Sequence, residues 1–284
     1  MILGDRFEIF AAAQAAYVAR IPIAHIHGGE ITEGVIDEGI RHSLTKMSHL
    51  HFVATEIYRR RVIQMGETPE RVFNFGAPGL DLLLRMKLLT QGELEKSIEF
   101  LLRKPTFLVT YHPVTLSPTG SRQSMHELLS ALDRYPSATV LFTKPNSDTD
   151  SRVITQMIDD YVDKNFTRAR TFTSLGQLRY FSALKHADVV IGNSSSGLIE
   201  APFLKKAVVN IGARQKGRLK ASSIIDCEES CDAIVNAIDT ALSPSFQRAL
   251  EGCASLYGIG NASKKIKEAV KNVDINNILI KKFY

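Results

Sequence analysis

Short apolar runs rich in β-branched residues alternate along the chain with longer segments in which apolar residues recur every three or four positions. The short runs predict β-strands over residues 21–26, 50–54, 72–75, 107–111, 139–143, 188–191 and 207–211. The longer segments predict helices over residues 7–20, 35–47, 125–135, 152–162, 178–186 and 231–242. Because strands and helices alternate regularly, the pattern predicts an α/β protein with doubly wound parallel sheets.

The alternation is interrupted after residue 75, where Gly-Ala-Pro-Gly precedes a mixed helical stretch. We place a domain junction in this interval. The predicted domains are a Rossmann-like domain over residues 1–88, a second over residues 89–261 and a Lys-rich helical tail over residues 262–284. Met1-Ile2-Leu3 runs straight into Gly4-Asp5, like a buried strand that lacks its beginning, so we expect the first domain to be incomplete.

Composition narrows the class of protein. Hydrophobic residues make up 44% of the 284 residues and charged residues 23%, which excludes disordered, collagen-like and coiled-coil chains. The net charge of +5 favours anionic ligands, but the basic residues are scattered, so a small phosphorylated molecule is expected and nucleic acid is not. No apolar run approaches the ~18 residues of a membrane span, and the chain start lacks a signal-peptide layout. We therefore expect a cytoplasmic protein without a membrane partner.

Ligands of open α/β sheets bind beyond the carboxyl ends of the strands, so residues that directly follow a strand are the candidates for function. Gly4-Asp5-Arg6 follows Met1-Ile2-Leu3, the strand-like start of the chain that precedes the seven runs above, and opens a helix, whose free N–H groups attract an anion. Arg6 can add a guanidinium to a phosphate. Asp5 has two open interpretations, a helix cap or a catalytic carboxylate.

Carboxylates and imidazoles follow the second strand. His25-Ile26-His27-Gly28-Gly29-Glu30 comes first, and Asp37-Glu38 with Arg41-His42 opens the next helix. Such pairs suit general acid–base catalysis. The alternatives are helix-dipole compensation with an i,i+4 ion pair around Asp37, and a hydrogen-bonded core histidine at His25. A metal site is not expected, because no His or Cys partner lies in register.

Two further motifs follow later strands. In His112-Pro113-Val114-Thr115 the proline fixes the exit of the chain, and His112 is either catalytic or a structural strand-end histidine. Gly192-Asn193-Ser194-Ser195-Ser196-Gly197 offers N–H and O–H groups to a diphosphate, and Glu200 can accept from ribose hydroxyls. An ordinary serine cap does not explain three serines, and no Walker, Gly-x-Gly-x-x-Gly or Gly-x-Ser-x-Gly motif is present. Arg214 is either a phosphate clamp or a solvated loop residue.

These motifs, with Arg214-Gln215-x-Gly217-Arg218 and Tyr257-Gly258-x-Gly260-Asn261-Ala262, resemble in order the hydrolysing UDP-N-acetylglucosamine 2-epimerases. The resemblance implies two Rossmann-like domains of the glycosyltransferase-B type and no metal or redox cofactor. It implies that UDP-N-acetylglucosamine, or a UDP-diacetamido-trideoxyhexose, and water give the 2-epimeric free sugar and UDP through a glycal. It further implies a role in sialic- or legionaminic-acid biosynthesis and a homo-oligomer, either a dimer or a tetramer.

The same resemblance implies the residues of the site. The implied catalytic residues are Asp5, Glu30, Asp37 and His112. The implied substrate- and UDP-binding residues are Arg6, His27, Ser194, Ser195, Ser196, Gly197, Glu200 and Arg214. Many members of the family carry Glu in place of His27, which makes Glu30 a candidate for the third carboxylate.

Members of that family begin with further βα units, on the order of 60–90 residues, that precede the first strand seen here. Two alternatives therefore accompany the expectation of an active epimerase. One is an inactive truncated fragment that only binds UDP, and the other is a glycosyltransferase of the same architecture.

Overall fold

The computed structural model describes the chain in two compact units. The described residues are 1–33, 35–114, 120–145 and 151–284. The first unit comprises Met1–Arg85, Lys216–Arg218 and Leu256–Tyr284, and the second comprises Met86–Gln215 and Leu219–Ser255.

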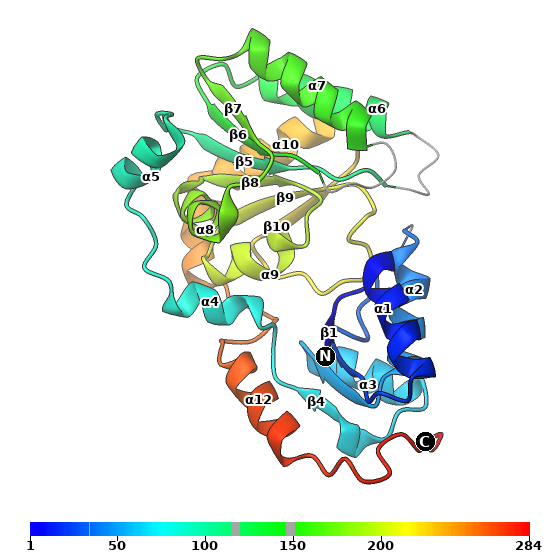
Figure 1. Ribbon diagram of the computed structural model, residues 1–284. Helices are drawn as coiled ribbons and strands as arrows, with labels where there is room; N and C mark the ends of the chain where they lie inside the picture. Colours follow the sequence, from blue (N-terminus) through cyan, green and yellow to red (C-terminus); the bar gives the residue numbers. More distant parts are fainter. Residues whose placement is uncertain (34, 115–119, 146–150) are drawn as a thin grey trace. The chain divides into compact units, whose positions relative to one another are not determined.

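The first unit is built on a parallel sheet of four strands in the order β1-β2-β3-β4. Figure 1 labels β1 and β4 of this sheet. Its strands are β1 (Ile2–Leu3), β2 (Ala24–Ile26), β3 (Leu50–Val53) and β4 (Val72–Asn74). Its helices are α1 (Phe7–Val18), α2 (Asp37–Met47), α3 (Glu56–Gln64), η1 (Pro69–Arg71), α4 (Gly79–Arg85) and α12 (Ala262–Asn272). Because each strand pairs with the next in sequence through a right-handed crossover, α1, α2 and α3 share one face.

The opposite face of this sheet is covered by the end of the chain. Ile266 of α12 and Ile278 pack in one buried cluster with Ile26, Leu50 and Phe52. The last 29 residues, Leu256–Tyr284, therefore complete the core of the first unit.

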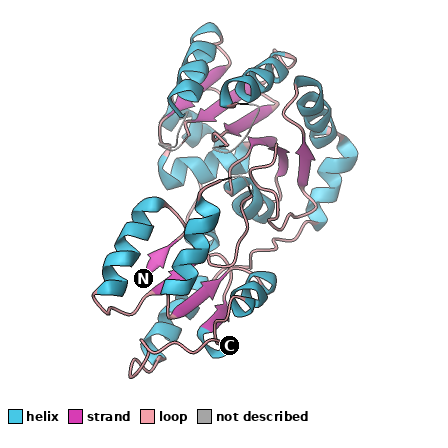
Figure 2. Ribbon diagram, turned by 90° about the vertical axis from the view of Figure 1, so that its right-hand side faces the viewer, coloured by secondary structure: helices cyan, strands magenta, loops and turns pink. Residues whose placement is uncertain are grey.

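The second unit contains a parallel sheet of six strands in the order β10-β9-β8-β5-β6-β7. Its strands are β5 (Thr106–Thr110), β6 (Thr139–Thr143), β7 (Ala169–Phe172), β8 (Val189–Gly192), β9 (Ala207–Ile211) and β10 (Ile224–Cys227). Its helices are α5 (Gln91–Ile98), α6 (Ser121–Asp133), α7 (Ser151–Lys164), α8 (Gly176–His186), α9 (Ser196–Phe203), α10 (Cys231–Leu242), α11 (Pro244–Ala249) and η2 (Leu250–Gly252). Figure 2 shows the helices of each unit flanking its strands. The strand order reverses between β5 and β8, where ligands of such sheets bind.

Gly192 sets the spacing at this reversal. It ends β8 opposite Thr110 of β5, with φ at +132°. A Cβ atom there would lie 2.0 Å from the Thr110 carbonyl oxygen, so a side chain cannot be accommodated without moving a strand. The glycine thus lets the two strands end close together.

The predicted α/β class with parallel sheets is confirmed, and a strand lies within or overlaps each of the seven predicted ranges. The second strand is shorter than predicted, because residues 21–23 precede it and Ile21 is 54% exposed. The pattern missed β7 and β10, which lie at the two sheet edges and carry the exposed residues Arg170 and Asp226. Within the described ranges, no helix combines the length and apolar character needed to cross a membrane.

Candidate functional site

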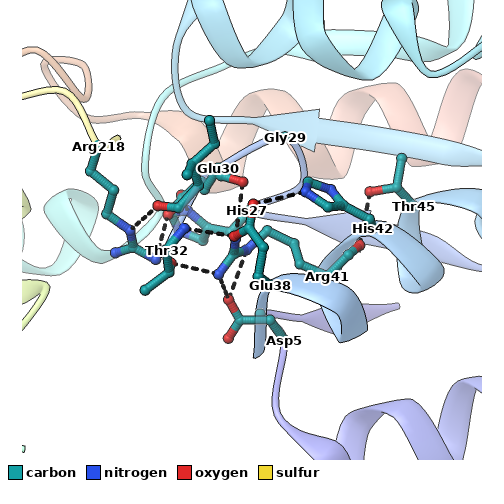
Figure 3. A network of polar contacts seen from close by, with 12 residues as sticks. Asp5, His27, Gly29, Glu30, Thr32, Glu38, Arg41, His42, Thr45 and Arg218 are labelled. Carbon is teal, nitrogen blue, oxygen red and sulfur yellow. Dashed lines mark hydrogen bonds and ion pairs between the residues drawn. The ribbon is translucent and has the colours of Figure 1, made fainter. Parts of the chain in front are cut away.

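Arg41 of α2 lies at the centre of a polar network in the first unit (Figure 3). Its side chain is 1% exposed. Nε and Nη2 donate hydrogen bonds to Asp5 Oδ2 at 2.8 and 2.5 Å. Nη1 donates to Glu38 Oε2 at 2.6 Å and to the Glu30 carbonyl oxygen at 2.9 Å, and Nη2 donates to Thr32 Oγ1 at 2.7 Å. All five guanidinium N–H groups have acceptors, so the network fixes the Asp5 carboxylate.

Glu30 forms the buried end of this network. Its side chain is 3% exposed, and Oε1 accepts a hydrogen bond from His27 Nδ1 at 2.6 Å. Its Oε2 pairs with Arg218 Nη2 at 3.0 Å, and Arg218 also donates from Nε to the Ile31 carbonyl oxygen. Burial alone would raise the pKa of Glu30, but Arg218 and His27 outweigh it and lower the pKa to about 2. Glu30 is therefore ionised at neutral pH.

The first turn of α2 carries the other carboxylates. Asp37 is its first residue and is half-buried. Glu38 Oε1 accepts from His42 Nε2 at 2.9 Å, and Oε2 accepts from the Thr32 backbone N–H at 2.6 Å. Burial would raise the pKa of Glu38, but these contacts and Arg41 outweigh it and lower the pKa to about 2. The i,i+4 pair that the sequence offered as an alternative is thus present between Glu38 and His42.

His25 is a core histidine. It is 0% exposed, and Nε2 donates to the Gly4 carbonyl oxygen at 2.8 Å, which holds the loop before Asp5. Burial lowers the pKa of His25 to about 4, so the ring is neutral at pH 7. The structural alternative for this residue is confirmed.

Arg6 lies at the N-cap of α1, next to Asp5 in the chain. Its Nε is 3.4 Å from Glu8 Oε2, and its guanidinium lies 5.5 Å from the centre of the Phe7 ring. The predicted phosphate-binding Arg6 is thus the sequence neighbour of Asp5, which belongs to the Arg41 network, and it stands at the start of α1.

His112 and Asn193 meet at the carboxyl edge of the second sheet. His112 follows β5 and is 7% exposed, whereas Asn193 follows β8 and is 0% exposed. Asn193 Oδ1 accepts from the His112 backbone N–H at 2.7 Å, and Nδ2 donates to the His112 carbonyl oxygen at 2.8 Å. The Asn193 amide therefore fixes the backbone of His112. Thr115, the last residue of the predicted motif, lies outside the described residues.

The serine-rich turn lies where α9 begins. It consists of the half-buried Ser194, Ser195 and Ser196 and the buried Gly197. The Ser196 backbone N–H donates to Ser194 Oγ at 3.4 Å. A Cβ atom at Gly197 would lie 3.1 Å from Val208 Cγ1, so the glycine allows α9 to approach β9. Glu200 is half-buried and lies further along α9.

Arg214 follows β9 and is anchored on this turn. Its Nη1 donates to the Asn193 carbonyl oxygen at 3.0 Å, and Gln215 Nε2 donates to the same oxygen at 2.7 Å. Arg214 is therefore held by the protein and is not a freely solvated loop residue.

The structure groups the predicted site residues into two clusters, one in each unit. The first cluster joins Asp5, His27 and Glu30, with Asp37 on the same helix as Arg41. The second gathers His112, the serine turn and Arg214 around Asn193. Sequence reasoning did not select Arg41, Arg218 or Asn193. Arg41 and Arg218 could have been selected as basic residues inside recognised motifs. Asn193 could have been selected as a polar residue directly after a buried strand.

Groups of three or more His, Cys, Asp or Glu side chains placed to hold a metal ion do not occur among the described residues. In the first cluster, Arg41 and Arg218 pair with carboxylates. In the second, Arg214 pairs with a backbone carbonyl oxygen. Such contacts can orient the protein's carboxylates in the first unit. In the second unit they can orient an anionic group of a ligand.

Comparison with known proteins bears on what these clusters do. A family profile described as UDP-N-acetylglucosamine 2-epimerase matches residues 1–271. The chain is 42% identical to GDP/UDP-N,N'-diacetylbacillosamine 2-epimerase (hydrolyzing) of Campylobacter jejuni, over 100% of this chain and 73% of that protein. It is 35% identical to UDP-N,N'-diacetylbacillosamine 2-epimerase (hydrolyzing) of Legionella pneumophila, over 99% and 73%.

A solved structure shares the fold. The crystal structure of UDP-GlcNAc 2-epimerase from Neisseria meningitidis bound to UDP-GlcNAc superimposes with a TM-score of 0.80 at 21% identity. The match covers 95% of this chain and 75% of that chain.

Proposed function

Because the chain belongs to the UDP-N-acetylglucosamine 2-epimerase family, we propose that it is a hydrolysing 2-epimerase of a UDP-linked 2-acetamido sugar. The products are UDP and the free sugar with inverted configuration at C2. Two relatives, at 42% and 35% identity, are named for UDP-N,N'-diacetylbacillosamine, which favours a diacetamido-trideoxyhexose over N-acetylglucosamine as the sugar.

The proposed reaction has two steps. In the first, a base removes the proton at C2, the C1–O bond breaks, and the electron pair leaves with UDP to give a glycal. In the second, a water oxygen adds to C1 and a proton is delivered to C2 from the opposite face. Both steps need carboxylates held in position, and the first also needs donors aimed at the departing diphosphate.

We assign the proton transfers to Asp5 and Asp37. Asp5 is supported by its geometry, because both hydrogen bonds that it accepts from Arg41 end on Oδ2, and Oδ1 receives neither. Asp37 is supported by its place at the start of α2, in the same helix as Arg41. Glu30 is the third proposed catalytic carboxylate: being ionised at neutral pH, it can act as a base, and it also holds His27 and Arg218 in place.

We assign UDP to the second cluster. The support is a turn of three serines at a helix start, Arg214 anchored beside it, and His112 with its backbone fixed by Asn193. In this assignment His112 and Arg214 face the diphosphate, while Glu200 accepts from the ribose. Arg6 and His27 are assigned to the substrate on the family resemblance alone.

The observation that carries the proposal is the Arg41 network, which holds the Asp5 carboxylate with one oxygen outside its hydrogen bonds. The test incubates the purified chain with UDP-N-acetylglucosamine and with UDP-N,N'-diacetylbacillosamine. UDP and the 2-epimeric free sugar are expected in equal amounts. UDP binding without turnover of either substrate would instead support a fragment that only binds UDP, and a product formed only with an acceptor would support a glycosyltransferase.

Further predictions belong to this proposal. A homo-oligomer of two or four chains and a role in sialic- or legionaminic-acid biosynthesis rest on the family resemblance, whereas the cytoplasmic location rests on the sequence analysis. The predicted limits of the Rossmann-like domains at residues 1–88 and 89–261, with a tail over 262–284, rest on the sequence pattern.

A further inference from the structure

The segment after α12 stays within the first unit and ends beside the last turn of α2. In Figure 1 its red trace leaves α12, passes β4 and reaches the C-terminus. The Arg71 guanidinium donates to the Ile278 carbonyl oxygen at 3.0 Å, and the Tyr284 backbone N–H donates to the Gly66 carbonyl oxygen at 3.0 Å. The segment is therefore fixed along its length.

Lys281 of this segment caps the C-terminal end of α2. Its Nζ donates to the carbonyl oxygens of Ser48 at 2.5 Å and Lys46 at 2.8 Å. It also pairs with Glu67 Oε2 at 2.8 Å. An ammonium group has three donors, and these contacts use all of them. The last carbonyl oxygens of a helix lack partners within the helix and carry a partial negative charge, which a lysine compensates.

Glu67 is the buried anion that holds Lys281 in place. Its side chain is 4% exposed, and it also contacts Lys46 Nζ at 2.6 Å and His51 Nε2 at 3.0 Å. Burial would raise the pKa of Glu67, but His51 and the two lysines lower it to about 2. The Glu67 carboxylate thus binds Lys46 of α2 and Lys281 of the segment after α12.

The two ends of α2 make different contacts. The first turns carry Asp37, Glu38 and Arg41, and the last turn is held by Lys281. At ~1.5 Å per residue, an eleven-residue helix is roughly 16 Å long and moves as one body. A displacement of its C-terminal end therefore also displaces Arg41, which holds the Asp5 carboxylate.

We propose that Lys281 is a positioning residue for the reaction: by capping α2, it sets the placement of Asp37 and of the Arg41–Asp5 pair. This inference rests on the proposed function. Lys281 lies at the far end of the helix from these groups, so its loss is expected to affect the chemical step more than substrate binding.

The test compares Lys281→Met, Lys281→Arg and the control Lys282→Met with the wild-type chain. Lys282 is the exposed neighbour of Lys281. Lys281→Met is expected to lower kcat about tenfold with KM within twofold of wild type, because small misplacements of catalytic groups are costly. Lys281→Arg, which keeps the charge and the donors, is expected to recover most of kcat, and Lys282→Met is expected to match wild type.

Amide hydrogen exchange of α2 gives a second readout that does not depend on activity. Faster exchange at residues 44–48 is expected in Lys281→Met and not in Lys282→Met. An unchanged kcat in Lys281→Met, or an equal loss in Lys282→Met, would overturn the inference. If the wild-type chain turns over neither UDP-sugar, the proposed function fails, and unchanged exchange in α2 would then overturn the capping role as well.

Discussion

Arg41 and Asp5 lie 36 positions apart in the sequence and are joined by two hydrogen bonds from a guanidinium that is 1% exposed. Arg41 comes from the second turn of α2, and Asp5 from the loop that follows β1. This pair connects the end of one strand to a helix that also carries Asp37 and Glu38. The first cluster therefore depends on Arg41 for its geometry.

Arg41→Lys is expected to damage both stability and turnover. A lysine has three donors and no planar fork, so it leaves acceptors around it unpaired. We expect the free energy of unfolding to fall by about 3 kcal/mol and kcat to fall roughly 100-fold. Urea unfolding and steady-state kinetics measure these changes. The control is Arg60→Lys, at a side chain that is 78% exposed, and an equal effect there would contradict the role of Arg41.

The stability of the first unit is expected to depend on the ionisation of Glu30. Its pKa is lowered on folding from 4.5 to about 2, so its ionised form stabilises the folded chain above pH 4.5. This contribution is lost as the pH falls from 4.5 towards 2. Glu30→Gln should therefore lower the free energy of unfolding, on the order of 3 kcal/mol at pH 7, and by much less at pH 3. A loss that is equal at both pH values would contradict the stabilising role of the ionised Glu30.

Gly192→Ala is expected to destabilise the second unit. The new Cβ would lie 2.0 Å from the Thr110 carbonyl oxygen, at a φ of +132° that a side chain rarely adopts. We expect a loss of at least about 3 kcal/mol in urea unfolding. Gly92→Ala on α5 is the matched control, because nothing lies within 4 Å of its Cβ position, and it should be neutral or stabilising.

Asn193→Ala is expected to weaken UDP binding. It leaves the buried backbone N–H and carbonyl group of His112 without the amide that pairs them, so the strand end next to the serine turn loses its fixed geometry. We expect the Kd for UDP to rise about tenfold by calorimetry. Asn236→Ala, at an exposed position of α10, should leave the Kd unchanged, and a normal Kd in Asn193→Ala would refute the assignment.

The alternation of strands and helices was predictable, because buried parallel strands consist of short runs rich in β-branched residues. Edge strands such as β7 and β10 were not, since exposed positions such as Arg170 and Asp226 interrupt the apolar pattern. Periodicity also does not indicate that α12 covers the first sheet, where Ile266 packs with Ile26, Leu50 and Phe52.

The site was predictable as motifs but not as contacts. Residues after strands were selected as a class, and His112 and the serine turn do meet around Asn193. The pairing of Glu30 with Arg218 spans 188 positions and depends on a loop that joins the first unit, which no local pattern encodes. For the same reason, the lowered pKa of Glu30 could not be anticipated.

The proposed reaction inverts C2 of a UDP-linked 2-acetamido sugar by elimination and hydration. NMR of the purified chain with UDP-N,N'-diacetylbacillosamine or UDP-N-acetylglucosamine in deuterated water follows the exchange of hydrogen at C2. We expect a free 2-epimeric sugar that carries deuterium at C2, formed together with UDP. A free sugar that keeps its original configuration and its C2 proton would overturn the proposed reaction.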